Sequence, residues 1–318
     1  MTTAAGRADS GTGAASDAGA AGATPLPRVA VVGLGIMGAA IARNLATAGF
    51  EVAGYDTDPA RLAALARDGV AACASAPAAV ARADVLLTSL PADAALDATV
   101  DALLQAGVPR AFDWLELSTL SLDCKQRNLG RLAATGITLL DCPISGTGAQ
   151  AARRDLAVYA SGDAAAWRRC AAVVAGFARA NHYVGAFGHG TRLKFVANLL
   201  VAIHNVASAE ALGLAVRAGL DPAQACELLG TGAAASKILE LRGPLMARGI
   251  YEPATMKLEV WQKDLALIDA FARDCDAPTP LFSATLPLYA AAVQAGLGPQ
   301  DTAAVFRIMQ EMDHDAAT

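Results

Sequence analysis

The chain has 318 residues, enough for one or two domains with a large buried core. Its net charge of −5 is mild and its basic residues form no blocks, which argues against nucleic acid as a partner. The high mean hydropathy comes mostly from alanine, and we expect no uninterrupted apolar stretch of the ~20 residues that a membrane helix needs.

The N-terminal segment differs in composition from the rest of the chain. Residues 1–26 are mostly Ala, Gly, Ser, Thr and Asp, so they bury too little apolar surface to offset the entropy of ordering, and we predict a disordered tail. The segment lacks the basic start and apolar run of a secretory signal, and a mitochondrial transit peptide would carry more Arg and less Asp. The six cysteines form no CxxC pair and the four histidines show no ligand spacing. These patterns predict buried thiols, no metal site and a cytoplasmic protein.

Short apolar strands alternate with helical segments up to about residue 188. Strands are expected at 28–33, 51–56, 85–91, 112–118, 137–143, 156–162 and 182–185, and helical periodicity is clear at 36–49 and 58–69. Such alternation is typical of βαβ units. It predicts an α/β domain over residues 27–188, with a Rossmann-type, doubly wound and mostly parallel sheet.

The character of the chain changes after Gly188. The remainder reads as helix after helix, beginning with a long one at about 191–218, and glycine and proline supply the turns between them. This pattern predicts an all-helical domain over residues 189–318.

A glycine-rich loop follows the first expected strand. The sequence GLGIMG at 33–38 fits G-x-G-x-x-G and opens a helix. Gly33 allows the tight turn, Gly35 lets the backbone approach a pyrophosphate, and Gly38 lets the helix pack closely on the strand. The helix N-terminus at Ile36 and Met37 offers free N–H groups to phosphate. The context favours a dinucleotide site over a purely structural turn.

An acidic residue ends the second expected strand. Asp56 lies 18 residues after Gly38, where a carboxylate can bond the ribose hydroxyls and repel a 2′-phosphate, so we predict NAD, with NADP possible as a second cofactor. Two alternatives stay open. Asp56 could serve only to cap the next helix, for which Asp58 is better placed, and Arg61 could contact a phosphate.

A second glycine-rich stretch, DCPISGTGAQ at 141–150, follows a later strand. It gathers Ser145, Gly146 and Thr147 in one turn, and such a turn can present N–H groups and hydroxyls to a small carboxylate. Ser, Gly and Thr are also ordinary loop residues, so a plain surface loop is an equal alternative at this point.

The long helix carries two polar residues among apolar neighbours. Lys194 and Asn198 are four residues apart and share a helix face, with Asn205 roughly on the same side. A simple solvent-facing stripe is the alternative, but a stripe of this length would normally carry more Glu and Lys. A lysine between apolar walls has a lowered pKa and can serve as a general acid or base.

Four segments together resemble motifs of the β-hydroxyacid dehydrogenase family, within the 6-phosphogluconate dehydrogenase superfamily. They are GLGIMG at 33–38, DCPISGTGAQ at 141–150, GHGTRLKFVAN at 188–198 and KDLAL at 263–267. The likeness runs from about Arg28 to Gln310, and four motifs in the right order are far more specific than one. The resemblance implies an NAD(P)-dependent oxidoreductase that interconverts a small 3-hydroxy acid and its aldehyde or keto acid.

The resemblance also implies roles for particular residues. Lys194 would be the general acid/base and Asn198 would orient the substrate beside it. The substrate carboxylate would bind at Ser145, Gly146 and Thr147. Near the nicotinamide would lie Leu90 and Pro91 of the SLP loop, Thr119 of the LST segment, and Lys263, with Asp264 in a structural role.

Two positions depart from the family pattern. Ala197 stands where the first Asn of the catalytic motif is usual, and Thr147 replaces the second Gly of the substrate motif. An imine reductase and a non-catalytic dinucleotide-binding module are the alternatives on the same fold, and the presence of Lys194 speaks against both. Apolar residues of the helical domain, with the resemblance, imply a homodimer or homotetramer: Leu193, Leu199, Ile203, Leu212 and Leu214.

Overall fold

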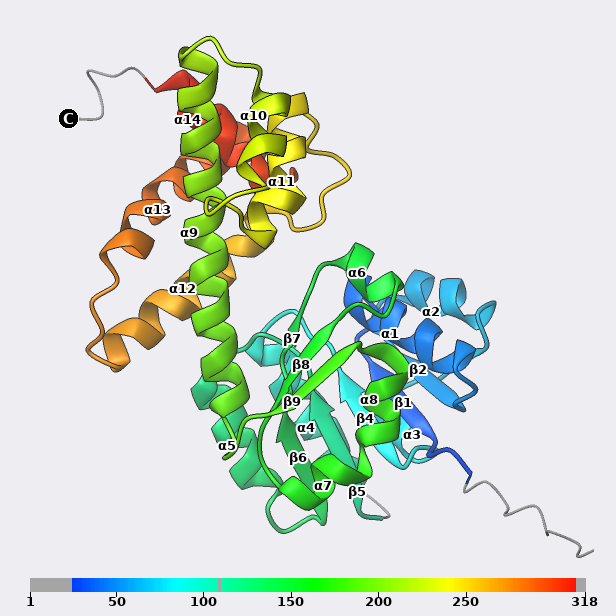
Figure 1. Cartoon of the computed structure of the whole chain (residues 1–318). Helices are drawn as coiled ribbons and strands as arrows, with labels where there is room; N and C mark the ends of the chain where they lie inside the picture. The colour runs from blue at the N-terminus through cyan, green and yellow to red at the C-terminus, as the bar shows by residue number, and fades with distance from the viewer. Residues whose placement is uncertain (1–24, 108–109, 313–318) are drawn as a thin grey trace, which may run out of the picture.

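The computed structural model describes residues 25–107 and 110–312. The predicted tail, residues 1–26, lies outside the described residues except for its last two. Sheet strands come first in the chain and helices alone follow, as Figure 1 shows.

A six-stranded parallel sheet forms the centre of the N-terminal part. The strand order is β3-β2-β1-β4-β5-β6, and every neighbouring pair is parallel, which confirms the predicted Rossmann-type fold. Of these six strands, the sequence reading missed the three-residue β3; outside this sheet it also missed the two-residue strand Ile144–Ser145. The strands are β1 (Val29–Val32), β2 (Val52–Tyr55), β3 (Val70–Ala72), β4 (Val85–Thr88), β5 (Phe112–Glu116) and β6 (Ile137–Asp141).

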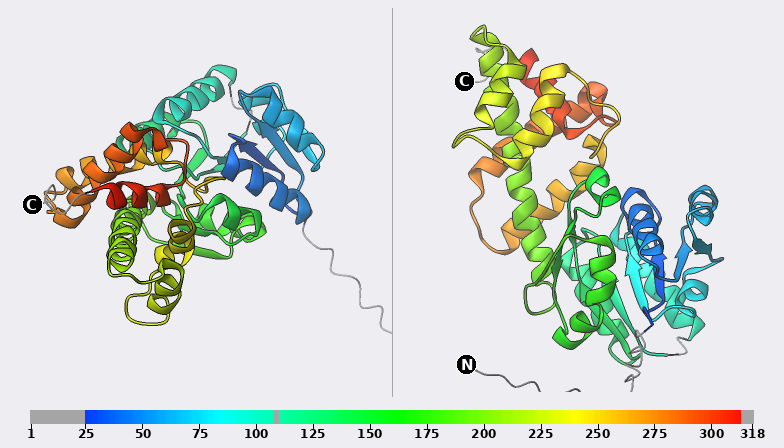
Figure 2. Two further views of the ribbon diagram at one scale, coloured as in Figure 1. Left: turned by 90° about the horizontal axis from the view of Figure 1, so that it is seen from above. Right: turned by 45° about the vertical axis from the view of Figure 1, so that its right-hand side comes forward.

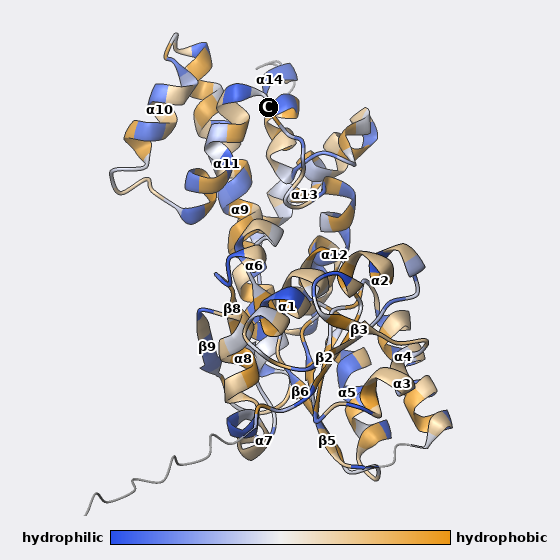
Figure 3. Ribbon diagram, turned by 90° about the vertical axis from the view of Figure 1, so that its right-hand side faces the viewer, coloured by the Kyte–Doolittle hydropathy of each residue, from blue (hydrophilic) through white to orange (hydrophobic). Residues whose placement is uncertain are grey.

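Helices cover both faces of this sheet because the strands are apolar on both sides. Val29 and Val31 of β1 belong to the core on one face, whereas Ala30 and Val32 belong to the core on the other. Figure 3 shows α3 and α4 on the side of the sheet away from α8. The helices between the strands are α1 (Ile36–Thr47), α2 (Pro59–Ala66), α3 (Ala76–Val80), α4 (Asp93–Ala106) and α5 (Leu122–Leu132).

The last strands do not extend the parallel sheet as predicted. They form a separate three-stranded sheet in which β7 (Ile144–Ser145) runs antiparallel to β8 (Ala157–Ala160), and β9 (Ala180–Tyr183) runs parallel to β8. The chain keeps its direction from the end of β6 into β7, because Asp141 already pairs antiparallel with Ser161; it reverses between Ser145 and Ala157, so β8 returns antiparallel to β7. Figure 3 colours β9 blue, which marks hydrophilic residues, and this agrees with its exposed position at the edge of the sheet. The helices that connect the strands of this smaller sheet are α6 (Gly148–Ala152), α7 (Ala164–Arg169) and α8 (Ala171–Phe177).

One long helix organises the C-terminal part. Helix α9 (His189–Arg217) contacts all five helices that follow it, and its buried apolar side chains join theirs in a single core. Figures 1 and 2 show α10, α11 and α14 beside its upper part, while α12 lies lower along it, where Phe271 packs on Phe195, and its first turns lie beside the sheet. The others are α10 (Pro222–Leu229), α11 (Lys237–Arg248), α12 (Leu258–Asp274), α13 (Pro280–Ala292) and α14 (Val305–Glu311).

Helix α9 requires a correction to the sequence reading. By length and composition it is apolar enough to cross a membrane, the one such helix among the described residues, although no such stretch was expected. Its fully buried positions include the polar Thr191 and Asn205, and five helices pack on it. This is the arrangement of a central helix in a helical core. Of the six free cysteines, five are buried and Cys275 is exposed, contrary to its prediction.

Candidate active site

The glycine loop has the shape that a pyrophosphate cradle requires. Gly33 adopts φ +87°, and a Cβ there would lie 2.2 Å from the Ser89 carbonyl oxygen. A Cβ on Gly38 would lie 1.8 Å from the Gly33 carbonyl oxygen. A Cβ on Gly35 would meet only the Arg61 guanidinium, at 3.8 Å, so the backbone at Gly35 is open to a ligand. No side chain caps α1, whose N-terminus begins at Ile36. The loop therefore fits a dinucleotide phosphate.

Asp56 lies beside this loop, at the end of β2. Its carboxylate accepts hydrogen bonds from the Leu34 N–H at 2.6 Å and the Asp58 N–H at 2.8 Å. Burial raises the pKa of Asp56, but these N–H groups and Arg61 outweigh it, so the pKa lies below its usual range. Asp58 caps α2 through the Ala60 N–H, which leaves Asp56 to face the loop. Met37 packs into the core, whereas the Ile36 side chain is exposed.

The second glycine-rich turn lies against the first. A Cβ on Gly148 would come within 2.5 Å of the Ile36 side chain, and the Asn44 amide donates to the Ala151 carbonyl across α1 and α6. Ser145 ends β7, and Gly146 has φ +141°, a conformation that favours glycine. The Thr147 hydroxyl accepts from the Gln150 N–H in a capping box. The departure at Thr147 therefore serves to cap α6.

Two loops at the carboxyl end of the sheet are tied together and to the helical part. The Leu90 N–H, next to exposed Pro91, donates to the Ser118 hydroxyl at 2.7 Å. Lys263 of α12 donates to the Thr119 carbonyl at 2.5 Å. The strand order reverses between β1 and β4, where ligands bind in open α/β sheets, so these residues border the expected crevice.

Lys194 is buried on α9, with a side chain that reaches no carboxylate within ion-pair distance among the described residues. Burial lowers the pKa of its ammonium to about 8; Asp264 acts to raise it and Lys263 to lower it. Helix α9 begins tightly against the end of β6, because a Cβ on Gly190 would lie 2.8 Å from the Asp141 carbonyl oxygen. A buried lysine with a lowered pKa is a suitable candidate for a general acid or base.

Asn198 lies one turn further along α9 and is held by Asp264, to which the resemblance gave only a structural role. Its amide donates to the Asp264 carboxylate at 3.1 Å, and the other Asp264 oxygen lies 3.2 Å from the Lys263 ammonium. Asp264 thus links Asn198 with Lys263. Its position directly after Lys263 was the only local signal, because its partner is 66 residues away in sequence.

Other polar residues of this region belong to the helical core. The Asn205 amide donates to the Tyr289 hydroxyl and the Thr302 carbonyl, both at 3.0 Å, so the predicted polar stripe of α9 divides into a site half and a core half. Trp261 is also buried and packs edge-on against Tyr289.

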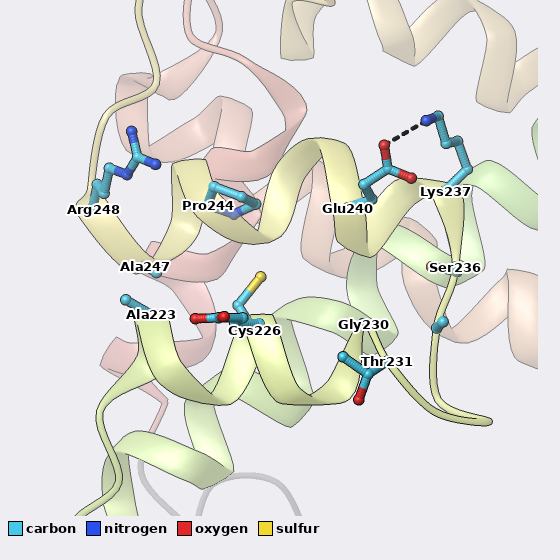
Figure 4. Close-up of a pocket in the computed structure, with 12 residues that line it drawn as sticks. Ala223, Cys226, Gly230, Thr231, Ser236, Lys237, Glu240, Pro244, Ala247 and Arg248 are labelled. Atoms are coloured by element: carbon cyan, nitrogen blue, oxygen red, sulfur yellow. Dashed lines mark hydrogen bonds and ion pairs between the residues drawn. The ribbon is translucent and has the colours of Figure 1, made fainter.

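A separate groove of about 750 Å³ lies between α10 and α11. Figure 4 shows Cys226 and Pro244 on its walls and the ion pair of Lys237 with Glu240 at one end. None of the predicted site residues lines it, so we assign it no part in the candidate site.

The fold and the site together define a nicotinamide-nucleotide-dependent oxidoreductase. The glycine cradle and Asp56 fit a dinucleotide at the switch point of the sheet, and Lys194 can exchange a proton.

Comparisons with known proteins agree with this class. Residues 28–185 match the family described as the NAD binding domain of 6-phosphogluconate dehydrogenase, and residues 188–309 match the NAD-binding family of NADP-dependent 3-hydroxyisobutyrate dehydrogenase. An L-threonate dehydrogenase of Cupriavidus necator is 32% identical over 88% of this chain and 95% of its own. The chain belongs to the β-hydroxyacid dehydrogenase family.

Solved structures show the same likeness. A Mycobacterium tuberculosis 3-hydroxyisobutyrate dehydrogenase with L-serine aligns with a TM-score of 0.81 at 29% identity, over 90% of this chain and all of the other. An imine reductase from Pseudomonas sp. aligns with a TM-score of 0.60 at 22% identity, over 89% of this chain and 99% of the other, and shares the fold alone.

Proposed function

We propose that this protein oxidises a small 3-hydroxy acid to its aldehyde or keto acid, or runs the reverse reduction, with Lys194 as the general acid/base. The observation that carries the proposal is the buried lysine with a pKa of about 8, one helical turn from an amide held by Asp264. Two of the proteins compared above, an L-threonate dehydrogenase and a 3-hydroxyisobutyrate dehydrogenase, are dehydrogenases of hydroxy acids. A lysine in this role distinguishes the chain from an imine reductase or a binding module.

The proposed roles follow from the chemistry of each group. The nicotinamide supplies the hydride acceptor when it is bound. The Ser145–Gly146 turn holds the substrate carboxylate, and Asn198 orients the hydroxyl beside Lys194. The neutral Lys194 amine takes the hydroxyl proton in the oxidation, and the ammonium returns it in the reduction. Such a proton transfer contributes ~10²–10⁴-fold to the rate, and positioning supplies the rest.

A substrate panel tests the proposal. We expect at least one of 3-hydroxyisobutyrate, glycerate, threonate, serine and hydroxymethylglutarate to produce NADH absorbance, with both NAD and NADP assayed. Reduction of a cyclic imine, with no response to any hydroxy acid, would favour the imine reductase instead. Cofactor binding without turnover of either class would indicate a binding module.

A preference for NAD is the finer part of the proposal, and it rests on Asp56. The ionised carboxylate next to the loop repels a 2′-phosphate, and it also engages Arg61, which pairs with Asp56 and Asp58 at 3.4 Å and would have to leave Asp56 to pair with such a phosphate. We expect Asp56→Ala to shift the ratio of kcat/KM for NAD over NADP at least about tenfold toward NADP, or about 1.4 kcal/mol. An unchanged ratio would remove Asp56 from cofactor selection. Adding Arg61→Ala to the Asp56→Ala variant should weaken NADP binding again.

We also propose a homodimer or homotetramer that pairs through the helical part. Leu193, Val196 and Leu200 lie on one face of α9, with exposed fractions of 39%, 52% and 48%. The set of residues predicted to contact another subunit therefore changes. Leu212 is fully buried, and Leu199 and Ile203 pack into the core. Light scattering should give a dimer or tetramer, and a Leu200→Glu variant a smaller species. A wild-type monomer at micromolar concentration would contradict this.

The remaining expectations are proposals too. We propose that the protein works in the cytoplasm on a small molecule, with neither a membrane nor a nucleic acid as partner. The scattered free cysteines and the mild charge support this, and fractionation of cells that express the full chain tests it.

A further inference from the structure

A buried ion cluster lies under the candidate site and has no part in the mechanism above. The Lys125 ammonium of α5 contacts the Glu116 carboxylate at 2.6 Å and the Asp141 carboxylate at 2.8 Å, and it donates to the Ser118 carbonyl at 2.8 Å. The side chains of Lys125, Glu116 and Asp141 are fully buried. One cation thus joins the ends of β5 and β6 to the loop that follows β5.

Asp141 continues the cluster into the start of α9. Its carboxylate accepts from the Thr191 N–H at 2.8 Å, from the Thr191 hydroxyl at 2.6 Å and from the Ser161 hydroxyl at 3.1 Å. The Ser161 hydroxyl accepts from the Gly190 N–H at 3.0 Å. The N-cap residue Gly188 has no side chain to serve these N–H groups, so Asp141 and Ser161 act as the cap. A carboxylate at a helix N-terminus is also favoured by the helix dipole.

The other end of the cluster reaches the nicotinamide side of the crevice. Lys125 holds the Ser118 carbonyl, and the Ser118 hydroxyl holds the Leu90 N–H. The next residue, Thr119, accepts the hydrogen bond of Lys263. Lys125 therefore connects the two loops expected beside the cofactor with the helix that bears Lys194, one turn beyond Thr191.

Stability alone is a weak reason to bury such a cluster. Desolvation of a buried ion pair costs about as much as the attraction returns, and apolar residues of similar volume are often as stable. Two carboxylates against one ammonium leave a net negative charge, which the N-terminus of α9 helps to balance. Burial acts to lower the pKa of Lys125, but the two carboxylates outweigh it and raise the pKa, so the cation is permanent.

We propose that Lys125 is a positioning residue of the active site: through Asp141 it fixes the start of α9, and with it Lys194, relative to the Ser118–Thr119 loop. The proposal rests on the function proposed above. Catalytic geometry tolerates little error, since a misplacement of about 1 Å can cost about a hundredfold in rate. Lys125 contacts neither substrate nor cofactor in this scheme and acts only through the helix and the loop.

Two variants separate position from stability. Lys125→Met removes the cation, and the double variant Lys125→Met/Glu116→Gln also removes one carboxylate, which restores the net charge of the cluster. We expect both to lower kcat about a hundredfold with little change in the KM for NAD. The double variant should do so with near-normal thermal unfolding. Thr191→Val, which removes the hydroxyl donor from α9 to Asp141 and leaves the backbone donor and every charge in place, should lower kcat in the same direction by a smaller factor.

The pKa of Lys194 gives a readout that does not depend on turnover. The chain has five lysines, so methylation with an isotope-labelled reagent gives a simple NMR spectrum in which Lys194 can be titrated and assigned by a Lys194→Arg variant. Lys194 faces Asp264 and Lys263 of α12. If the start of α9 shifts and admits water, its pKa should rise from about 8 toward 10.5 in the Lys125 variants.

Arg242→Met is the matched control. Arg242 is a buried cation paired with buried Asp301 in the helical core, so its loss destabilises the protein without touching the cluster. This variant should keep the wild-type kcat and the wild-type pKa of Lys194. If the double variant and Thr191→Val keep wild-type kcat and an unchanged Lys194 pKa, the positioning role is wrong. If wild-type protein oxidises no hydroxy acid, the proposed function fails, while the titration still decides the role of Lys125.

Discussion

Replacing Lys194 by alanine is expected to lower turnover at least about a hundredfold while NAD binding stays intact. The side chain lies on α9, apart from the glycine loop and Asp56, so its loss removes proton transfer and leaves the cofactor cradle in place. The measurements are the steady-state rate with the best substrate of the panel and the dissociation constant of NADH by fluorescence. Near-normal turnover would end the assignment of Lys194 as the acid/base.

The rates should also depend on pH, because oxidation and reduction need opposite protonation states of Lys194. Oxidation needs the neutral amine, so its rate should fall as the pH drops below about 8; reduction needs the ammonium, so its rate should fall as the pH rises above about 8. The residual activity of Lys194→Ala should show neither inflection. Lys237→Ala, which removes an exposed lysine of α11, is the control and should keep both rate and profile.

The sequence was sufficient to place those candidate site residues that form local patterns. The glycine loop, Asp56 at a strand end, and the four-residue spacing of Lys194 and Asn198 are local patterns with a physical reason for each residue type. The structure places them at the switch point of a parallel sheet and on one helix, which is where those patterns predict them.

The parts that could not be predicted depend on contacts between distant segments. The bond of Asn198 to Asp264 and the pairing of Lys125 with two strand ends carry no local signal, because a lysine in a helix usually faces water. Asn205 shows the converse limit. Helical periodicity places it near the Lys194 face, but whether that face meets a crevice or a core changes along α9, and only the packing of α13 decides it.

Gly35→Ala is expected to weaken NAD binding by about ten- to a hundredfold, or about 1.4–2.8 kcal/mol, while the protein folds normally. The new Cβ meets no protein atom closer than Arg61 at 3.8 Å, and Gly35 has φ −67°, which alanine adopts without strain. The methyl group instead occupies the space through which the backbone approaches the pyrophosphate. Calorimetric titration with NAD and thermal unfolding without ligand are the two measurements.

Two further glycine variants make this result specific to the ligand. Gly38→Ala puts a Cβ 1.8 Å from the Gly33 carbonyl oxygen, so it should destabilise the loop itself and lower the unfolding temperature before any ligand is added. Gly130→Ala, inside α5 with nothing within 4 Å of the new Cβ, should bind NAD as the wild type does and gain stability of about 0.5–1 kcal/mol. Normal NAD affinity in Gly35→Ala would mean that the pyrophosphate does not cross this glycine. The cofactor would then have to bind away from the N-terminus of α1, because Gly35 is the N-cap residue of that helix.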